Sequence, residues 1–100
     1  MSAQAVIQAT SKPLFPIGRL VATLGALKAM EQLGVVPMAL VSRHVSGDFG
    51  DLCEEDRQEN ETAIKHGLRI LSAYQIQEVK FWIITEADRS ATTILLPEEY

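Results

Sequence analysis

The chain is poor in cysteine, in aromatic residues and in long apolar runs, and each shortage excludes a class of protein. Its single cysteine, Cys53, cannot form an internal disulfide, which favours a reducing compartment over the disulfide-rich secreted domains. No apolar stretch approaches the roughly 18 residues that would span a membrane. The first residues have neither a basic start nor a continuous apolar core, so they do not predict a secretion signal. We therefore expect a cytoplasmic, bacterial-type protein without membrane contact.

Basic clusters and metal- or nucleotide-binding motifs are also missing. The nine Lys and Arg residues are scattered singly, whereas contact with a nucleic-acid backbone needs them clustered. The sequence contains no H-x-x-H, H-E-x-x-H, C-x-x-C or P-loop spacing. We expect no cofactor, no metal and no direct binding of nucleic acid.

Acidic residues, in contrast, gather in one segment. Between positions 51 and 61, six acids and one base give a net charge of −5, and because the whole chain carries −4, the other 89 residues carry +1. The chain is thus a near-neutral body with one acidic element. Its acids are Asp51, Glu54, Glu55, Asp56, Glu59 and Glu61.

The C-terminal part carries the clearest structural signal. Two apolar, β-branched runs at 79–85 and 91–96 flank the polar turn 86–89, which predicts a β-hairpin. Alternating apolar residues over 68–76 predict a preceding strand, and 18–23 predicts a further short strand. Successive side chains of a strand point to opposite faces, so at least one of the adjacent Phe81 and Trp82 should lie in the core.

Three helices are predicted between the first strand and the second. Apolar residues recur at helical spacing over 24–33, where Thr23 suits the N-cap and Gly34 the end. Pro37 suits the first turn of a second helix of about ten residues.

The third helix is predicted over 51–66 and carries the acidic segment. Asp51 and Glu54 have the spacing of a capping box, and Gly67 fits the end of the helix. Because its apolar face is thin, its middle should be solvated.

The length of the chain is that of one domain. We expect an α+β domain over 17–100, in which an antiparallel sheet of three to four strands packs against about three helices. Residues 1–16, which contain Pro13 and Pro16, predict an extended or disordered tail.

Three segments of the chain have a distinctive amino-acid sequence: FPIGRLVAT at 15–23, GDFGDLCEED at 47–56 and FWIITEADRSATTILLPEEY at 81–100. Together they resemble, over most of its length, a small bacterial protein family of plasmids and integrated mobile elements. Its members are sometimes labelled plasmid-related protein or type I restriction endonuclease subunit M. The second label implies a DNA methyltransferase, whose cofactor domain needs a glycine-rich turn that this sequence lacks. The resemblance therefore implies a mobile-DNA setting and no particular reaction.

The acidic helix is the leading candidate site. Its acids either form an ordinary solvated helix face, supported by pairs such as Glu61 with Lys65, or dock a protein partner that has a basic surface. The spacing does not match a calcium-binding loop, which needs oxygen ligands at alternate positions around a central glycine.

A catalytic site would need a different set of residues. It would bring His44 or His66 beside Glu86, Asp88 and Arg89 of the hairpin turn. Each also has a structural interpretation: His44 should lie in the core, Asp88 should hydrogen-bond the turn backbone, and Arg89 should pair with Glu86. The acidic net charge opposes a nuclease, because it repels a polyanionic substrate.

Three functions therefore remain open. The first is a non-enzymatic protein-binding module of a mobile-DNA setting, and antagonism of a host defence nuclease through the acidic helix is one concrete version. The second is a small hydrolase or nuclease-type toxin. The third is the structural subunit of a homo-oligomer that uses an apolar sheet face as its interface.

Overall fold

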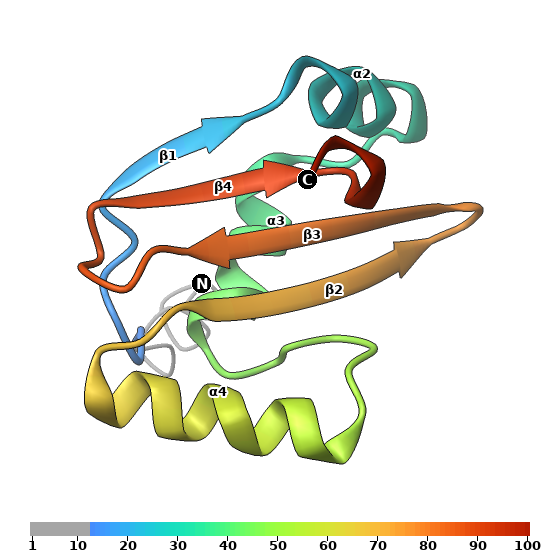
Figure 1. Ribbon diagram of the computed structural model, residues 1–100. Helices are drawn as coiled ribbons and strands as arrows, with labels where there is room; N and C mark the ends of the chain where they lie inside the picture. Colours follow the sequence, from blue (N-terminus) through green and yellow to red (C-terminus); the bar gives the residue numbers. More distant parts are fainter. Residues whose placement is uncertain (1–12) are drawn as a thin grey trace, which may run out of the picture.

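A computed structural model describes residues 13–100 as a four-stranded sheet backed by helices (Figure 1). Expectations that concern residues 1–12 lie outside the described residues. In chain order the elements are β1 (Arg19–Ala22), α2 (Leu24–Leu33), α3 (Pro37–Val45), α4 (Glu54–His66), β2 (Ile70–Ile76), β3 (Val79–Thr85), β4 (Ala91–Leu95) and the short 3₁₀ turn η1 (Pro97–Glu99).

The sheet is mixed, with the strand order β1-β4-β3-β2. The pairs β2–β3 and β3–β4 are antiparallel, whereas β1 joins β4 in parallel. The α+β class and the four strands are confirmed, but the expectation of a purely antiparallel sheet is wrong for this one pair. The three helices form a long crossover from β1 to β2, and such crossovers join strands that run in the same direction. Two hairpin reversals then bring β4 back into that direction.

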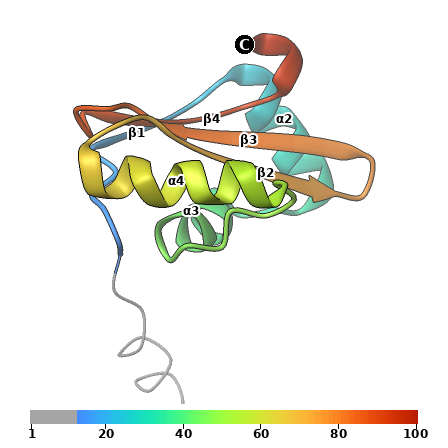
Figure 2. The same ribbon diagram turned by 60° about the horizontal axis from the view of Figure 1, so that its bottom comes forward.

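Helices cover one face of the sheet and one of its edges. Figure 2 shows α2 and α3 beneath the sheet, while α4 runs along the edge formed by β2. Within residues 13–100, the opposite face carries no α-helix, and η1 with Tyr100 lies over part of it. No single helix of this described part is long and apolar enough to cross a membrane; only α2 and α3 taken together, bent by 105° at their break, reach that length and composition.

The core lies between the sheet and the two helices beneath it. Its largest cluster joins Ala26 and Met30 of α2 to Phe81 and Ile83 of β3, and each of these side chains is at most 1% exposed. Trp82 points to the other face, where its ring meets that of Tyr100 with centroids 5.8 Å apart. The predicted division of Phe81 and Trp82 between the two faces is thus confirmed.

The ends of α2 and the start of α3 follow the predicted capping. The Thr23 hydroxyl accepts a hydrogen bond from the Ala26 amide at 3.2 Å, and Gly34 closes α2 with a φ of 72°. Pro37 opens α3. These boundaries are confirmed because each depends only on residues within one turn of the chain.

The predicted start of α4 is wrong. The helix begins at Glu54, its N-cap is Cys53, and no side chain caps it. The carboxylate of Asp51 does not close a capping box, because it accepts instead from the amide of Gln75 in β2 at 2.8 Å. Cys53 itself is exposed.

The packed part of the chain reaches back at least to Phe15, within the predicted tail. Phe15 is 5% exposed and packs with Phe49, Ala63 and Ile70 in a second, smaller cluster. This cluster joins the start of the described chain to α4 and β2.

Candidate functional site

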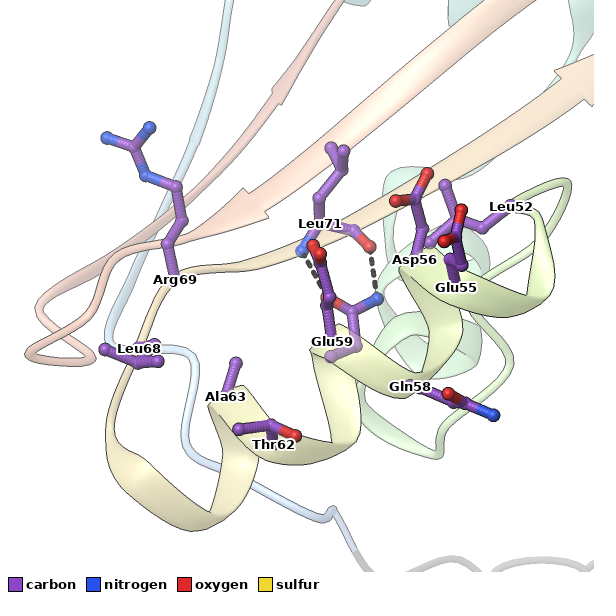
Figure 3. A pocket seen from close by; sticks show the side chains of 11 residues that line it. Leu52, Glu55, Asp56, Gln58, Glu59, Thr62, Ala63, Leu68, Arg69 and Leu71 are labelled. Carbon is purple, nitrogen blue, oxygen red and sulfur yellow. Dashed lines mark hydrogen bonds between the residues drawn. The ribbon is translucent and has the colours of Figure 1, made fainter.

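A hollow of the described surface lies between α4 and the start of β2. It is a groove of about 620 Å³ with an acidic rim on the helix side. Glu55, Asp56 and Glu59 form that rim, and Figure 3 shows Asp56 and Glu59 on the side of α4 that faces β2, with Gln58 pointing away. Residues three and four apart share one helix face, which is why these three acids meet.

Apolar side chains line the rest of the groove. Leu52 lies just before α4, Leu68 lies just after it, and Leu71 stands on β2. Leu68 is 52% exposed, which is high for a leucine so close to a strand. The groove therefore combines a negative rim with apolar walls, an arrangement that suits the long aliphatic stem and charged head of Arg or Lys.

Asn60 joins the helix to the strand at the floor of the groove. Its side-chain Nδ2 donates to the Leu71 carbonyl at 2.6 Å, and its Oδ1 accepts from the Leu71 amide at 3.1 Å (Figure 3). The side chain thus supplies the donor and the acceptor that a neighbouring strand would supply. Asn60 is only 5% exposed. Sequence reasoning missed it, although an asparagine inside a helix, three residues before the apolar Ala63, is a signal of a buried polar contact.

The loop before α4 completes the same edge of β2. The Ala73 amide donates to the Phe49 carbonyl at 3.1 Å, and the Asp51 amide donates to the Ala73 carbonyl at 2.7 Å. Gly50 lies between these two contacts with a φ of 79°, and a Cβ there would stand 2.0 Å from the Ala73 carbonyl oxygen. Only glycine allows the loop to run this close to the strand.

Only three of the six predicted acids line the groove. Asp51 is turned towards β2, while Glu54 and Glu61 are exposed on α4 outside the groove. The single base of the segment, Arg57, donates to the backbone carbonyls of Gly50 at 2.8 Å and Leu52 at 3.3 Å. The ion pairs of residues 13–100 are Arg43–Asp48 and Arg69–Glu86, so no rim acid of this part is in an ion pair. Arg69 also lines the groove, and it pairs with Glu86 instead of a rim acid.

The residues of the alternative catalytic site are engaged elsewhere. Arg89 donates to backbone carbonyls, including those of Leu68 at 2.7 Å and Ala63 at 3.0 Å, so its guanidinium ties the end of α4 to the hairpin turn. The Glu86 carboxylate pairs with Arg69 rather than with Arg89, and Asp88 accepts from the Ser90 amide at 3.0 Å. The expected local role of Asp88 is confirmed, and the expected Glu86–Arg89 side-chain pair is wrong.

His44 lies in the core, as predicted, at the head of a directed chain of hydrogen bonds. Thr92 donates to the Ile17 carbonyl at 2.8 Å, so Thr85 must donate to Thr92 at 2.7 Å. The Thr85 oxygen can then only accept, which makes Nε2 of His44 a donor at 2.9 Å and Nδ1 an acceptor from Ser72 at 2.6 Å. Burial lowers the pKa of His44 to about 4, which keeps the ring neutral.

The residues of the alternative catalytic set are divided between the core and the surface. His44 is fully buried and bonds to Ser72 and Thr85, whereas His66 is exposed in the last turn of α4. Among residues 13–100, no group of three His, Cys, Asp or Glu side chains is placed to hold a metal ion. The acidic groove combines a hollow with three rim acids that are in no ion pair of the described residues.

Comparison with known proteins gave no match to a family model, to a curated protein or to a solved structure.

Proposed function

We propose that the chain is a non-enzymatic protein-binding module whose acidic groove receives a basic segment of another protein. The observation that carries this proposal is the position of three acids, Glu55, Asp56 and Glu59, on the rim of the groove between α4 and β2. The one base of the same segment, Arg57, is occupied by backbone carbonyls, and Arg69, the base in the groove lining, pairs with Glu86, so both are engaged away from the rim acids.

The partner's chemistry follows from the walls of the groove. Leu52, Leu68 and Leu71 offer apolar contact to an aliphatic stem, and the rim offers carboxylates to a guanidinium or ammonium head. An exposed segment rich in Arg or Lys fits both. The resemblance to proteins of plasmids and mobile elements suggests one such partner, an Arg- or Lys-rich segment at the nucleic-acid site of a host defence nuclease, which this module would antagonise.

Binding of a synthetic arginine-rich peptide tests the groove directly. Titration should shift the NMR signals of the Asn60 side-chain amide and the Leu71 backbone amide, because both line the groove floor. Reversing Glu55 and Glu59 to Lys should weaken binding mainly through a slower, salt-dependent association rate. The same variant should unfold within about 0.5 kcal/mol of the parent, since exposed charges contribute little to stability.

The matched control reverses Glu54 and Glu61, which changes the net charge equally but lies outside the groove. This control should retain most of the parent's affinity. Equal losses in both variants, or peptide-induced shifts away from Asn60 and Leu71, would contradict the proposal and assign the acids to a solvated helix face. If the groove binds as expected, affinity purification of tagged parent and E55K/E59K from the bacterial host then identifies the natural partner.

A further inference from the structure

The edge strand β1 presents backbone groups that no described segment pairs. The amides of Arg19 and Thr23 donate to the carbonyls of Ser90 and Ile94, each at 3.0 Å, so these residues face β4. Backbone direction alternates along a strand, and the N–H and C=O groups of Leu20 and Ala22 therefore point away from the sheet. Within residues 13–100, β4 is the only strand beside β1. Such an edge is a template for a further strand.

The side chains of this edge are unusually apolar for an exposed strand. Leu20 is 37% exposed and Val21 is 41% exposed, and they lie on opposite faces because they are adjacent in the strand. Leu24 at the start of α2 continues the apolar character with 80% exposure. Edge strands that stay unpaired usually carry proline or several charges, and β1 has no proline and one charge, Arg19.

We propose that β1 pairs in antiparallel fashion with β1 of a second copy of this chain. A twofold axis through Val21 places Leu20 of one copy opposite Ala22 of the other, and the converse. Both pairs have their N–H and C=O groups directed outward, so each pair exchanges two hydrogen bonds. The two four-stranded sheets then become one continuous sheet of eight strands.

Charge complementarity favours a second copy of this chain as the partner of β1, and it favours the register that places Val21 on the twofold axis. With Val21 at the axis, Arg19 of one copy faces Thr23 of the other on the same side of the sheet. The Thr23 hydroxyl donates to the carboxylate of Glu99 in its own chain, so an exposed acid stands beside that position. Among the ion pairs of the described part, Arg19 has none. Each Arg19 thus meets the Glu99 of the other copy, and the symmetry makes this contact twice.

The interface is small, so the dimer should be reversible. A four-residue strand from each copy buries far less area than a permanent interface needs, which predicts association in the micromolar to millimolar range. Sedimentation velocity over about a hundredfold range of concentration should show the parent moving from monomer to dimer.

Substitution at the axis gives the first test. Val21→Lys brings two ammonium groups together at the axis and should abolish the dimer, whereas Val36→Lys, at an exposed valine outside β1, should not. Thermal unfolding of both variants checks that each is folded. A parent that stays monomeric over the whole range, or a V21K variant that dimerises as well as V36K, would overturn the proposal.

Charge exchange gives the second test, which addresses the register. R19E alone sets carboxylate against carboxylate at both contacts, and E99R alone sets guanidinium against guanidinium, so each variant should dimerise more weakly than the parent. An equimolar mixture of the two restores an opposite-charge contact in a mixed dimer. Recovery of dimer in the mixture, above the level of either variant alone, supports the pairing; a mixture that associates no better than its separate components would rule it out.

Discussion

The two edge strands of the sheet, β2 and β1, differ in whether other parts of the chain pair their outward-facing backbone groups. At the β2 edge, Asn60, Phe49 and Asp51 bond to outward backbone groups of three successive outward-facing residues: the amide and carbonyl of Leu71 and of Ala73, and the amide of Gln75. At the β1 edge, within the described part of the chain, nothing covers the equivalent groups of Leu20 and Ala22. An exposed edge invites pairing with other chains, so a protein either covers it or uses it.

This difference between the two edges indicates the structural role of the polar helix α4. Only Asn60 and Ala63 of its residues are buried, so α4 adds little apolar surface to the core. Its contribution is to close the β2 edge and, on its outer side, to hold acids over the resulting groove. At β1 the chain turns directly into α2, which packs beneath the sheet and leaves the edge free. Under the two proposals made above, the β2 edge offers charge to a different protein and the β1 edge offers backbone groups to a second copy of this chain.

The largest expected effect comes from the central strand that supports both edges. Ile83 of β3 is fully buried, and Ile83→Ala should lower the free energy of unfolding by about 2–5 kcal/mol through lost burial and a residual cavity. Val21→Ala at the open edge should cost well under about 1 kcal/mol, because that side chain is 41% exposed. Urea denaturation of both variants at low protein concentration measures the contrast. A cost below about 1 kcal/mol for I83A would contradict the assignment of β3 to the stability core.

The second prediction uses the hydrogen-bond chain that crosses the sheet between the two edges. The ring of His44 is neutral when folded, with its pKa lowered to about 4 by burial, whereas in the unfolded chain it protonates near 6.5. The unfolded state therefore takes up the proton first as pH falls. Stability is fully present above about pH 6.5 and declines towards pH 4, with a loss of about 2 kcal/mol between pH 7 and pH 5.

Chemical denaturation at those two pH values measures this loss, and NMR titration of the His44 ring identifies its source. The control is His44→Phe, which should be less stable at pH 7 because it breaks the chain at Ser72 and Thr85, but should lose most of the pH dependence in this window. Equal stability of the parent at pH 7 and pH 5 would show that the ring is protonated in the folded protein.

The third effect concerns the closure of the β2 edge. Asn60→Ala removes both hydrogen bonds to Leu71 and should cost about 1–3 kcal/mol, because a part-buried donor and acceptor lose their partner. Gln58→Ala, on the exposed side of the same helix, should change stability by less than about 0.5 kcal/mol. Hydrogen exchange should accelerate at the Leu71 amide in N60A alone. Unchanged exchange there would mean that the edge is closed by other contacts.

The features that the sequence predicted are those that local chemistry decides. Thr23, Gly34 and Pro37 mark helix boundaries because each acts on its own turn of backbone. The charge run at 51–61 predicted an acidic third helix, and three of its acids, Glu55, Asp56 and Glu59, line the groove. The burial of His44 also followed from the apolar pattern of its helix.

The features that the sequence did not predict depend on partners far along the chain. Asp51 has the spacing of a helix cap, yet the amide of Gln75 in β2 takes its carboxylate, and no local pattern ranks these two uses. The parallel pairing of β1 likewise depends on β4, a partner strand near the other end of the chain. The sequence also did not predict that β2 packs beside the acidic helix and forms the second wall of the groove. It therefore predicted an acidic surface but no hollow.

The hydrogen bonds from the Asn60 side chain to Leu71 affect how often α4 detaches and the β2 edge becomes exposed. Because α4 holds to the sheet through few buried contacts, it should detach in a local opening that leaves the central strands folded. In that opened state the groove no longer exists and β2 becomes a second free edge, so the molecule can add strands at both sides and begin to aggregate. A basic ligand bound in the groove would hold α4 in place and suppress this opening. Occupancy of the groove should therefore lengthen the protein's life in solution.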